Sequence, residues 1–348
     1  PLHSVDVSYM VNDSTGYIKI NRFARTTHDE FRQAIKKLNA QGMQKIIVDL
    51  RGNGGGYMDA ATDLANEFLS KNKLIVYTKG RARPKNEVHA NDKGLCLNHG
   101  VVVLIDEWSA SASEILAGAI QDNDRGMIIG RRSFGKGLVQ QQTVFPDGSA
   151  LRLTVARYYT PTGRCIQKPY KNGDDSYYDD LNQRFKHGEF QERDSIDHSD
   201  SLIYTTPEGD TVYGGGGIMP DVFVPYDTTR YSDYYQQASR KGLIYKFAFR
   251  YADNHRDQLD QYKTAEEFDS YLSQQNLLDD FVNYASENGV KKNSAGIEQS
   301  EKILLSQIKA YIARNIIGDE GFYPILHRTD KTFNRAREII TSSPQRLK

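Results

Sequence analysis

Hydrophobic and polar positions follow two different patterns along the chain. Between residues 16 and 163, short apolar runs alternate with amphipathic stretches, which is typical of strands exchanging with helices. The predicted strands cover residues 16–21, 45–49, 74–78, 101–105, 127–130, 138–144 and 150–159. The predicted helices between them cover residues 27–42, 59–69 and 111–122. This half of the chain therefore predicts an α/β fold.

The pattern changes after residue 160. From Thr160 to Pro225 the composition shifts to Asp, Tyr, Gly and Pro with little periodicity, which predicts a long excursion that returns at residues 214–220. From Tyr231 onward the periodicity is helical, over residues 265–272, 277–285, 297–317 and 332–340. We therefore expect two domains, namely a core of residues 1–230 that includes the excursion at 160–225, and a helical C-terminal region of residues 231–348.

Composition excludes several classes of partner. The chain has 348 residues, with 45 basic and 45 acidic side chains and a formal net charge of +0. Because it has no block of Lys and Arg, we expect no nucleic-acid partner. The mean hydropathy is −0.64, and no apolar stretch approaches the ~20 residues that cross a bilayer, so we expect no membrane span. The chain begins at Pro1 without a leader pattern, which indicates a processed or truncated piece of a longer precursor.

The two cysteines do not predict a metal site. Cys96 and Cys165 lie 69 positions apart, with neither the C-x-x-C spacing nor the paired histidines of a zinc site. A single disulfide between them stays open at this point.

Two glycine-rich segments raise the question of a nucleotide cofactor. Residues 130–137 (GRRSFGKG) come close to a phosphate-binding loop, but Gly137 stands where Ser or Thr is required, and strand-like residues follow. Residues 52–56 (GNGGG) lie between a strand and a helix, where N–H groups can converge on an anion. Tyr57 replaces the third glycine of the dinucleotide fingerprint, and a tight turn needing positive φ accounts for the glycines equally well. We expect no cofactor.

Residues 109–114 (SASASE) lie between the apolar strand 101–105 and a helix. A serine on such a turn is exposed and has small neighbours, and the N–H that follows can meet an oxyanion, so the serine suits a nucleophile. Ser111 with Glu114 three residues later is also a capping box, which is the commoner role of a serine at a helix start. The serine pattern alone leaves both interpretations open.

A serine nucleophile needs a base. The eight histidines lie in polar or loop-like contexts, and none lies beside an apolar strand end with a carboxylate nearby. Lys136 stands between two glycines with Phe134 and Leu138 close by, where its side chain can enter a dry pocket. To act near neutral pH its pKa must fall from about 10.4 to about 7–8, which burial in apolar surroundings can supply. A solvated lysine at a strand end is the other interpretation.

Five short motifs follow one another along residues 16–225. They are Gly16-Tyr17-Ile18, Asp49-Leu50-Arg51 with the glycines at 54–56, the serine turn 109–114, Gly135-Lys136-Gly137 with Gln140, and Gly217-Ile218 with Pro220 and Asp221. Together they resemble the carboxyl-terminal processing proteases, which are tail-specific serine peptidases of family S41. The resemblance implies a protease core of mixed strands and helices, in a crotonase-like or Clp-protease-like spiral, followed here by the C-terminal helical region.

The resemblance also implies roles for single residues. Ser111 matches the family's nucleophile and Lys136 its general base, 25 positions apart as in the family pattern. Gln140 matches a third polar residue that orients the lysine, although four residues along a straight strand span about 13 Å. Gly56 and Ala112 match the positions whose N–H groups form the oxyanion hole. Asp122 matches an acidic position whose role stays open.

The implied activity is a serine endopeptidase that cleaves polypeptides near their C-termini, in the periplasm or cell envelope. Polypeptide substrates and self-association are the expected partners. The chain departs from the family by showing no preceding peptide-binding PDZ domain, by Trp108 beside the serine turn, and by Cys165 where serine is common. The alternative is a non-catalytic module on the same fold that binds peptides or apolar ligands, against which an intact set of Ser111, Lys136 and Gln140 argues.

Overall fold

The computed structural model describes residues 3–170, 173–196 and 200–342, and its residues pack as two units. One unit comprises residues 1–225 together with 335–348, and the other comprises residues 226–334. The predicted domain limit at residue 230 stays a prediction. Among the described residues, no helix has both the length and the apolar character that a membrane crossing requires.

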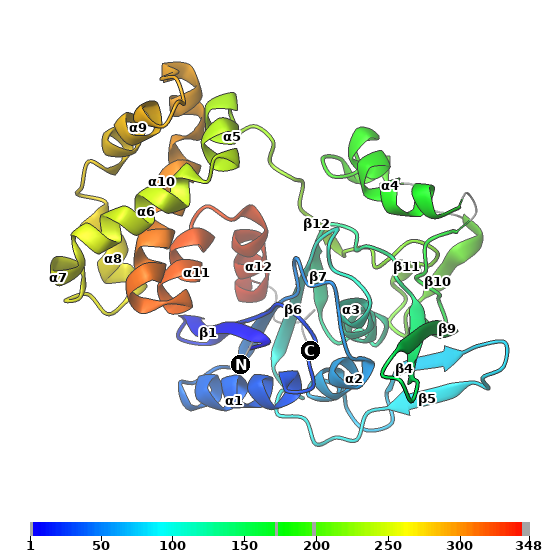
Figure 1. Ribbon diagram of the computed structural model, residues 1–348. Helices are drawn as coiled ribbons and strands as arrows, with labels where there is room; N and C mark the ends of the chain where they lie inside the picture. The colour runs from blue at the N-terminus through cyan, green and yellow to red at the C-terminus, as the bar shows by residue number, and fades with distance from the viewer. Residues whose placement is uncertain (1–2, 171–172, 197–199, 343–348) are drawn as a thin grey trace. The chain divides into compact units, whose positions relative to one another are not determined.

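A six-stranded sheet forms the centre of the first unit (Figure 1). Its strand order is β1 (Val5–Asn12), β2 (Thr15–Ile20), β3 (Lys45–Asp49), β6 (Gly100–Ile105), β7 (Met127–Gly130) and β12 (Val222–Phe223). β1 pairs antiparallel with β2, and the other neighbours are parallel, with Asp49 opposite Leu104 at the carboxyl ends of β3 and β6. Because helices cover a parallel sheet, its inner strands are almost wholly apolar. The carboxyl ends of β3, β6 and β7 therefore lead side by side into the loops that carry the candidate chemistry.

Three helices of the first unit follow strands of this sheet. They are α1 (Thr27–Ala40), α2 (Met58–Asn66) and α3 (Ala112–Asp122). α1 buries Phe31, Ile35 and Leu38 at helical spacing in the same apolar core as the sheet. α3 is buried on every side, as its predominantly apolar and small residues allow. The predicted α/β fold is confirmed, with strand and helix bounds mostly within a few residues of those expected.

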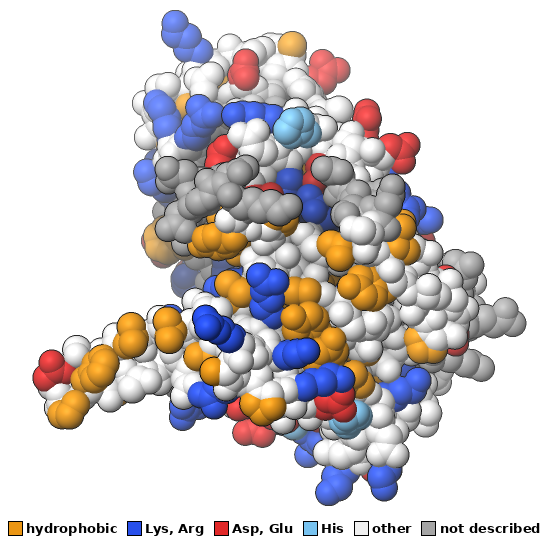
Figure 2. All heavy atoms as spheres, turned by 90° about the vertical axis from the view of Figure 1, so that its right-hand side faces the viewer, with side chains coloured by type: hydrophobic (Ala, Val, Ile, Leu, Met, Phe, Trp, Pro, Cys, Tyr) orange, Lys and Arg blue, Asp and Glu red, His pale blue; other side chains and the backbone are white. Residues whose placement is uncertain are grey.

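A second, antiparallel sheet has the order β5 (Asn86–His89), β4 (Leu74–Lys79), β9 (Ala150–Tyr159) and β8 (Leu138–Val144). β8 is an edge strand, and residues 140–154 of the β8–β9 hairpin are exposed along both strands. Figure 2 shows apolar side chains along the projecting arm, where Val144, Phe145, Leu151 and Leu153 are exposed.

The excursion contains more regular structure than its sequence pattern predicts. Helix α4 (Gly173–Lys186) is followed by two short 3-10 turns and by the two-stranded pair of β10 (Ile203–Thr205) and β11 (Thr211–Tyr213). The polar sequence of α4 has only a weak apolar periodicity, which is why no helix is expected there from the pattern alone.

The second unit is helical, which confirms the predicted fold class of the C-terminal region. Its helices are α5 (Asp233–Arg240), α6 (Leu243–Asn254), α7 (Arg256–Leu259), α8 (Ala265–Leu272), α9 (Leu277–Glu287), α10 (Ser294–Ile317) and α11 (Asp319–His327). α12 (Lys331–Ser342) begins in this unit. The helices enclose a core of their own, in which Phe247, Phe268 and Phe281 are buried. Each unit therefore has a separate apolar core.

Candidate active site

Ser111 lies on the sharp turn between β6 and α3, where the sequence predicts it. Its backbone has φ +56° and ψ −111°, a sparsely populated conformation for a residue with a side chain. Ser111 is half-buried, whereas Ala110 and Ala112 on either side are buried. The predicted capping box is confirmed, since the Ser111 N–H donates to Glu114 Oε2 at 2.8 Å. A strained strand-to-helix turn of this kind also suits a nucleophile, so the cap and the nucleophile are compatible roles.

The glycine loop after β3 packs directly on this turn. Gly55 has φ +96°, and a Cβ atom there would lie 2.6 Å from Ala110 O and 2.8 Å from Ser111 Cβ. The two neighbouring serines bond to the same loop. Ser109 Oγ donates to Leu50 O and Ser113 Oγ donates to Asn53 O, each at 2.9 Å. The glycines therefore permit a close approach of two backbones, and Ser109 and Ser113 hold it.

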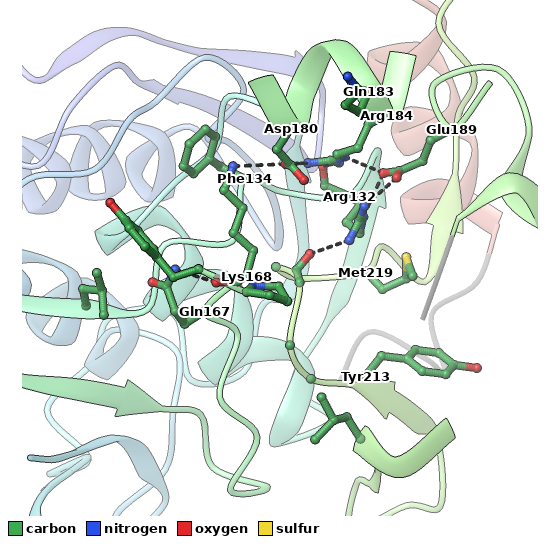
Figure 3. Close-up of a pocket in the computed structure, with 18 of the residues that line it drawn as sticks. Arg132, Phe134, Gln167, Lys168, Asp180, Gln183, Arg184, Glu189, Tyr213 and Met219 are labelled. Carbon is green, nitrogen blue, oxygen red and sulfur yellow. Dashed lines mark hydrogen bonds and ion pairs between the residues drawn. The ribbon is translucent and has the colours of Figure 1, made fainter. Parts of the chain in front are cut away.

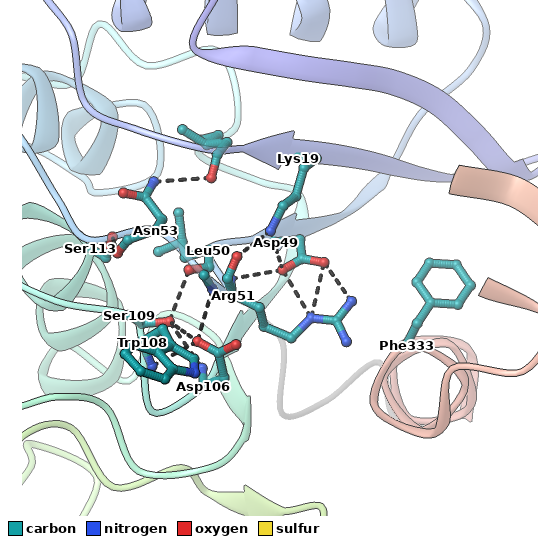
Figure 4. A network of polar contacts seen from close by, with 12 residues as sticks. Lys19, Asp49, Leu50, Arg51, Asn53, Asp106, Trp108, Ser109, Ser113 and Phe333 are labelled. Carbon is teal, nitrogen blue, oxygen red and sulfur yellow. Dashed lines mark hydrogen bonds and ion pairs between the residues drawn. The ribbon is translucent and has the colours of Figure 1, made fainter. Parts of the chain in front are cut away.

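The polar network at the end of β3 anchors the glycine loop (Figure 4). Burial alone would raise the pKa of Asp49, but the charges of Arg51 and Lys19 outweigh it and hold the pKa well below its ordinary range. Arg51 Nη2 approaches Asp49 Oδ2 at 2.6 Å, and Tyr17 OH donates to the same oxygen at 2.8 Å. Asp106, after β6, accepts from Gly52 N–H at 2.9 Å. The matched Asp49-Leu50-Arg51 piece thus has a structural role in fixing the loop.

A buried carboxylate connects the serine turn with the loop that carries Lys136. Glu114 Oε2 accepts from the N–H groups of both Ser111 (2.8 Å) and Lys136 (2.9 Å). Its Oε1 accepts from Gly135 N–H at 2.7 Å and from Ser133 Oγ at 2.5 Å. Burial raises the pKa of Glu114 above its ordinary value, and these hydrogen bonds oppose the rise. The two loops are therefore joined through one side chain.

Tyr158 on β9 makes a second connection between the same two loops. Its hydroxyl lies 3.1 Å from Ser111 O and 2.5 Å from Lys136 O, so its single proton is shared between two carbonyl acceptors. The ring is buried, and burial raises the pKa of the phenol well above its ordinary value, which keeps the hydroxyl a donor. The backbones of Ser111 and Lys136 are thus tied at both their N–H and their C=O groups.

The structure brings the main chains of Ser111 and Lys136 together, but not every side-chain contact that the sequence predicts for the site is formed. Over residues 3–170, 173–196 and 200–342, no hydrogen bond joins Ser111 Oγ to Lys136 Nζ or Gln140 to Lys136. Gln140 is exposed, and the pairing of β8 with β9 is irregular between Val139 and Gln140. The dyad and the orienting role of Gln140 stay predictions.

The predicted oxyanion-hole positions lie on the two packed loops. Gly56, with φ +150°, pairs with Phe23 in an isolated bridge, and Ala112 is the first residue of α3. Within the described part of the chain, neither N–H group has a hydrogen-bond acceptor. Both groups can therefore donate to a developing negative charge, although their role also stays a prediction.

The structure answers two questions that the sequence left open, namely the role of Asp122 and the state of the two cysteines. Asp122 Oδ1 lies 2.5 Å from Arg164 Nη2 in a fully buried ion pair, and Asp122 Oδ2 accepts from Thr162 Oγ1 at 2.7 Å. The carboxylate therefore attaches the end of α3 to the turn after β9. Cys96 and Cys165 are both free thiols.

A cavity of about 1410 Å³ lies beside the Lys136 loop (Figure 3). Phe134, Leu138 and Gln140 line one part of it, and the excursion supplies most of the remaining wall. Its volume exceeds the ~300–1,000 Å³ of small-molecule pockets, so it can hold a larger ligand. Among the described residues, no three His, Cys, Asp or Glu side chains gather in a way that could hold a metal ion.

The residues that sequence reasoning missed are those that support the loops. Glu114 is expected only as a helix cap, and its contacts with residues 133–136 have no signal in the spacing. Tyr158 lies in a predicted strand, but nothing in that strand marks its hydroxyl as a connection between two loops. Such partners are set by the tertiary fold.

Residues 14–174 match the profile of Peptidase family S41, and residues 234–318 match a family of unknown function (DUF8443). The chloroplastic carboxyl-terminal-processing peptidase 3 of Arabidopsis thaliana is 38% identical over 166 residues, which are 47% of this chain and 32% of that protein. The carboxyl-terminal-processing protease of Synechocystis sp. is 40% identical over 155 residues, which are 44% of this chain and 36% of that protein. The chain thus spans about a third of the length of these relatives.

Among solved structures, a photosystem II D1 C-terminal processing protease is similar with a TM-score of 0.44 and 28% identity, covering 61% of this chain and 42% of that one. The sequence matches confirm the resemblance to the carboxyl-terminal processing proteases. Residues 14–174 of this chain therefore belong to peptidase family S41.

Proposed function

We propose that the chain is a serine endopeptidase that cleaves polypeptides near their C-termini, with Ser111 as nucleophile and Lys136 as general base. The observation that carries the proposal is the shared acceptor, since one oxygen of Glu114 binds the N–H groups of both residues, at 2.8 and 2.9 Å. A structural helix cap needs no lysine loop on the same carboxylate. Two loops held together in this way serve a reaction that needs both residues.

The reaction begins with proton transfer. Lys136 in its neutral form takes the proton of Ser111 Oγ as that oxygen attacks the scissile carbonyl, and the negative charge moves to the carbonyl oxygen. The N–H groups of Gly56 and Ala112 donate to this oxyanion, where one donor is commonly worth ~3 kcal/mol. Ala112 begins α3, so the positive end of the helix dipole acts in the same direction. Lys136 returns the proton to the leaving amine, and water then hydrolyses the acyl-enzyme.

The preference for C-termini is supported by the relatives, which are named as carboxyl-terminal-processing peptidases. The cavity beside the Lys136 loop has a volume of about 1410 Å³, which is large for a small molecule and suits a polypeptide, and Gln140 lines it whereas Ser111 and Lys136 do not. A location in the periplasm or cell envelope and self-association stay predictions.

Peptide hydrolysis by the wild type and by Ser111→Ala and Lys136→Ala tests the proposal. We expect either variant to lose about 10⁴-fold or more in kcat while its circular dichroism stays that of the wild type. Ser70→Ala and Lys71→Ala, two exposed positions in a turn away from the site, are the controls and should keep full activity. Full activity in either site variant would sink the assignment. Tight binding of apolar ligands without hydrolysis of any peptide would favour the non-catalytic module instead.

A further inference from the structure

The loop between β7 and β8, residues 131–137, has no regular secondary structure, so its main-chain groups need partners from elsewhere. The acceptors of its N–H groups include Ser109 O, both oxygens of Glu114, Gln167 Oε1 and Ile218 O. Side chains supply three of these contacts, to residues 135–137, and the main-chain carbonyls of Ile105, Ser109 and Ile218 supply the others. The position of Lys136 therefore depends on how firmly those side chains are themselves held.

Arg184 on α4 takes two successive carbonyls of this loop. Its Nη1 donates to Ser133 O at 3.0 Å and its Nη2 donates to Arg132 O at 2.7 Å. The side chain is 5% exposed. A planar guanidinium can serve two carbonyls in a fixed geometry, which a single ammonium cannot do. Arg184 thus fixes both the place and the orientation of the start of the loop.

Glu189 in turn holds Arg184 (Figure 3). Its Oε1 accepts from Arg184 Nε at 2.7 Å and from Arg132 Nε at 2.8 Å, and its Oε2 accepts from Arg132 Nη2 at 2.5 Å. Arg132 Nη1 continues to Gly216 O at 3.0 Å. Buried charges of this kind require paired and hydrogen-bonded partners, so each side chain of the cluster is confined to one conformation.

A chain of hydrogen bonds leads from Arg184 to the predicted catalytic pair. Ser133, whose carbonyl Arg184 holds, donates its Oγ to Glu114 Oε1 at 2.5 Å and accepts from Ile218 N–H at 2.7 Å. Glu114 Oε2 then accepts from the N–H groups of Lys136 and Ser111. A displacement of Ser133 therefore reaches Lys136 along the chain and through Glu114.

We propose that Arg184, fixed by Glu189, is a positioning residue that sets the place of Lys136 relative to Ser111. Both residues lie beyond residue 174, where the match to peptidase family S41 ends, so the family match assigns them no role. The excursion thus supports the loop of residues 131–137, which carries Lys136, in addition to lining the cavity. This inference rests on the proposed function for its effect on catalysis, while the mechanical link from Arg184 to the loop can be measured without any activity.

The kinetic test uses Arg184→Ala and Arg184→Lys. A misplacement of 1 Å commonly costs about 10²-fold in rate, so we expect kcat of Arg184→Ala to fall about 10- to 100-fold. Arg184 also lines the cavity, so a change confined to KM would indicate substrate binding and would overturn the positioning role. Arg184→Lys should recover only part of the rate, because its ammonium keeps the charge but not the two-carbonyl geometry. Arg193→Ala is the matched control, an exposed arginine whose side chain makes no hydrogen bond with the described residues.

Hydrogen–deuterium exchange of residues 133–137 supplies the measurement that is independent of activity. We expect faster exchange there in Arg184→Ala and in Glu189→Gln, and wild-type exchange in Arg193→Ala. Unchanged exchange together with unchanged kcat would overturn the inference. A thermal melt lowered without any change in kcat below the transition would also overturn it, because that is the result of a merely structural role. If the wild type hydrolyses no peptide, the proposed function fails, and the exchange rates alone decide whether Arg184 positions the loop. If Arg184→Ala does not fold, Arg184→Lys and Glu189→Gln replace it.

Discussion

The serine turn and the lysine loop reach the same site with different kinds of support. The serine turn lies between a buried strand and a buried helix, and the glycine loop packs on it through main-chain contact and through the hydroxyls of Ser109 and Ser113, which belong to the turn and to α3. The lysine loop has no helix beside it in sequence and depends largely on side chains, namely those of Glu114, Tyr158, Gln167 and Arg184. The place of the predicted nucleophile is therefore a property of the fold, whereas the place of the predicted base is a property of particular side chains.

Glu114 and Tyr158 each contact both loops, and Glu114 accepts more hydrogen bonds from them, so its removal should have the largest effect. Glu114→Ala leaves four donors without their acceptor, and each unsatisfied buried donor costs about 1–3 kcal/mol. We expect the free energy of unfolding to fall by at least about 3 kcal/mol, measured by urea denaturation. Peptide hydrolysis should fall by about 10²-fold or more, because neither loop keeps its place.

Glu114→Gln is the matched variant, since it keeps the shape and one oxygen acceptor. It should lie between the wild type and Glu114→Ala in both measurements. If Glu114→Ala kept wild-type stability and activity, the idea that one carboxylate joins the two loops would be wrong.

The different supports explain how far the sequence could predict the fold. Strands β3 and β7 are found at the predicted residues, because an apolar run between turn residues is a local signal. Helix α4 was not predicted, since its polar sequence has little periodicity and its place depends on contacts such as that of Arg184 with Ser133. Local patterns predict elements that bury their own apolar face, and they miss elements that tertiary polar contacts hold.

The same division applies to the site. The serine turn could be located from the strand, the helix start and the small neighbours, and the family resemblance then selected Ser111 from its three serines. Glu114 was visible only as a cap, because its contact with Lys136 joins residues 22 positions apart. Gln140 was assigned through the family resemblance, and the irregular pairing at Val139 and Gln140 is a feature that no spacing predicts.

A substitution in the glycine loop tests the serine turn alone. Gly55→Ala places a Cβ atom 2.6 Å from Ala110 O at a residue with φ +96°, so steric overlap adds to backbone strain. We expect a loss of about 2–3 kcal/mol in the free energy of unfolding and a clear fall in kcat. Gly52→Ala is the control, because its φ is +71° but a Cβ atom there meets nothing within 4 Å. It should cost about 1 kcal/mol and leave kcat unchanged. Equal effects of the two substitutions would contradict a close approach of the glycine loop to the serine turn.

The smallest effect concerns an ion pair outside both loops, which separates loss of stability from loss of activity. His28 Nε2 lies 2.7 Å from Glu67 Oε1, and this hydrogen bond raises the pKa of His28 above its ordinary value. A histidine whose pKa is raised by folding stabilises the fold below its unfolded pKa of about 6.5, and this contribution is lost as the pH rises through the folded pKa. His28→Ala should therefore lower the free energy of unfolding by about 0.5 kcal/mol at pH 5.5, since solvent screens a partly exposed pair, and the difference should shrink by pH 8.5. Urea denaturation at the two pH values measures it, and kcat should equal that of the wild type at both. If the difference in the free energy of unfolding grew with pH, Glu67 would not favour the charged histidine. If kcat fell in His28→Ala, activity would follow general stability and not the support of the two loops.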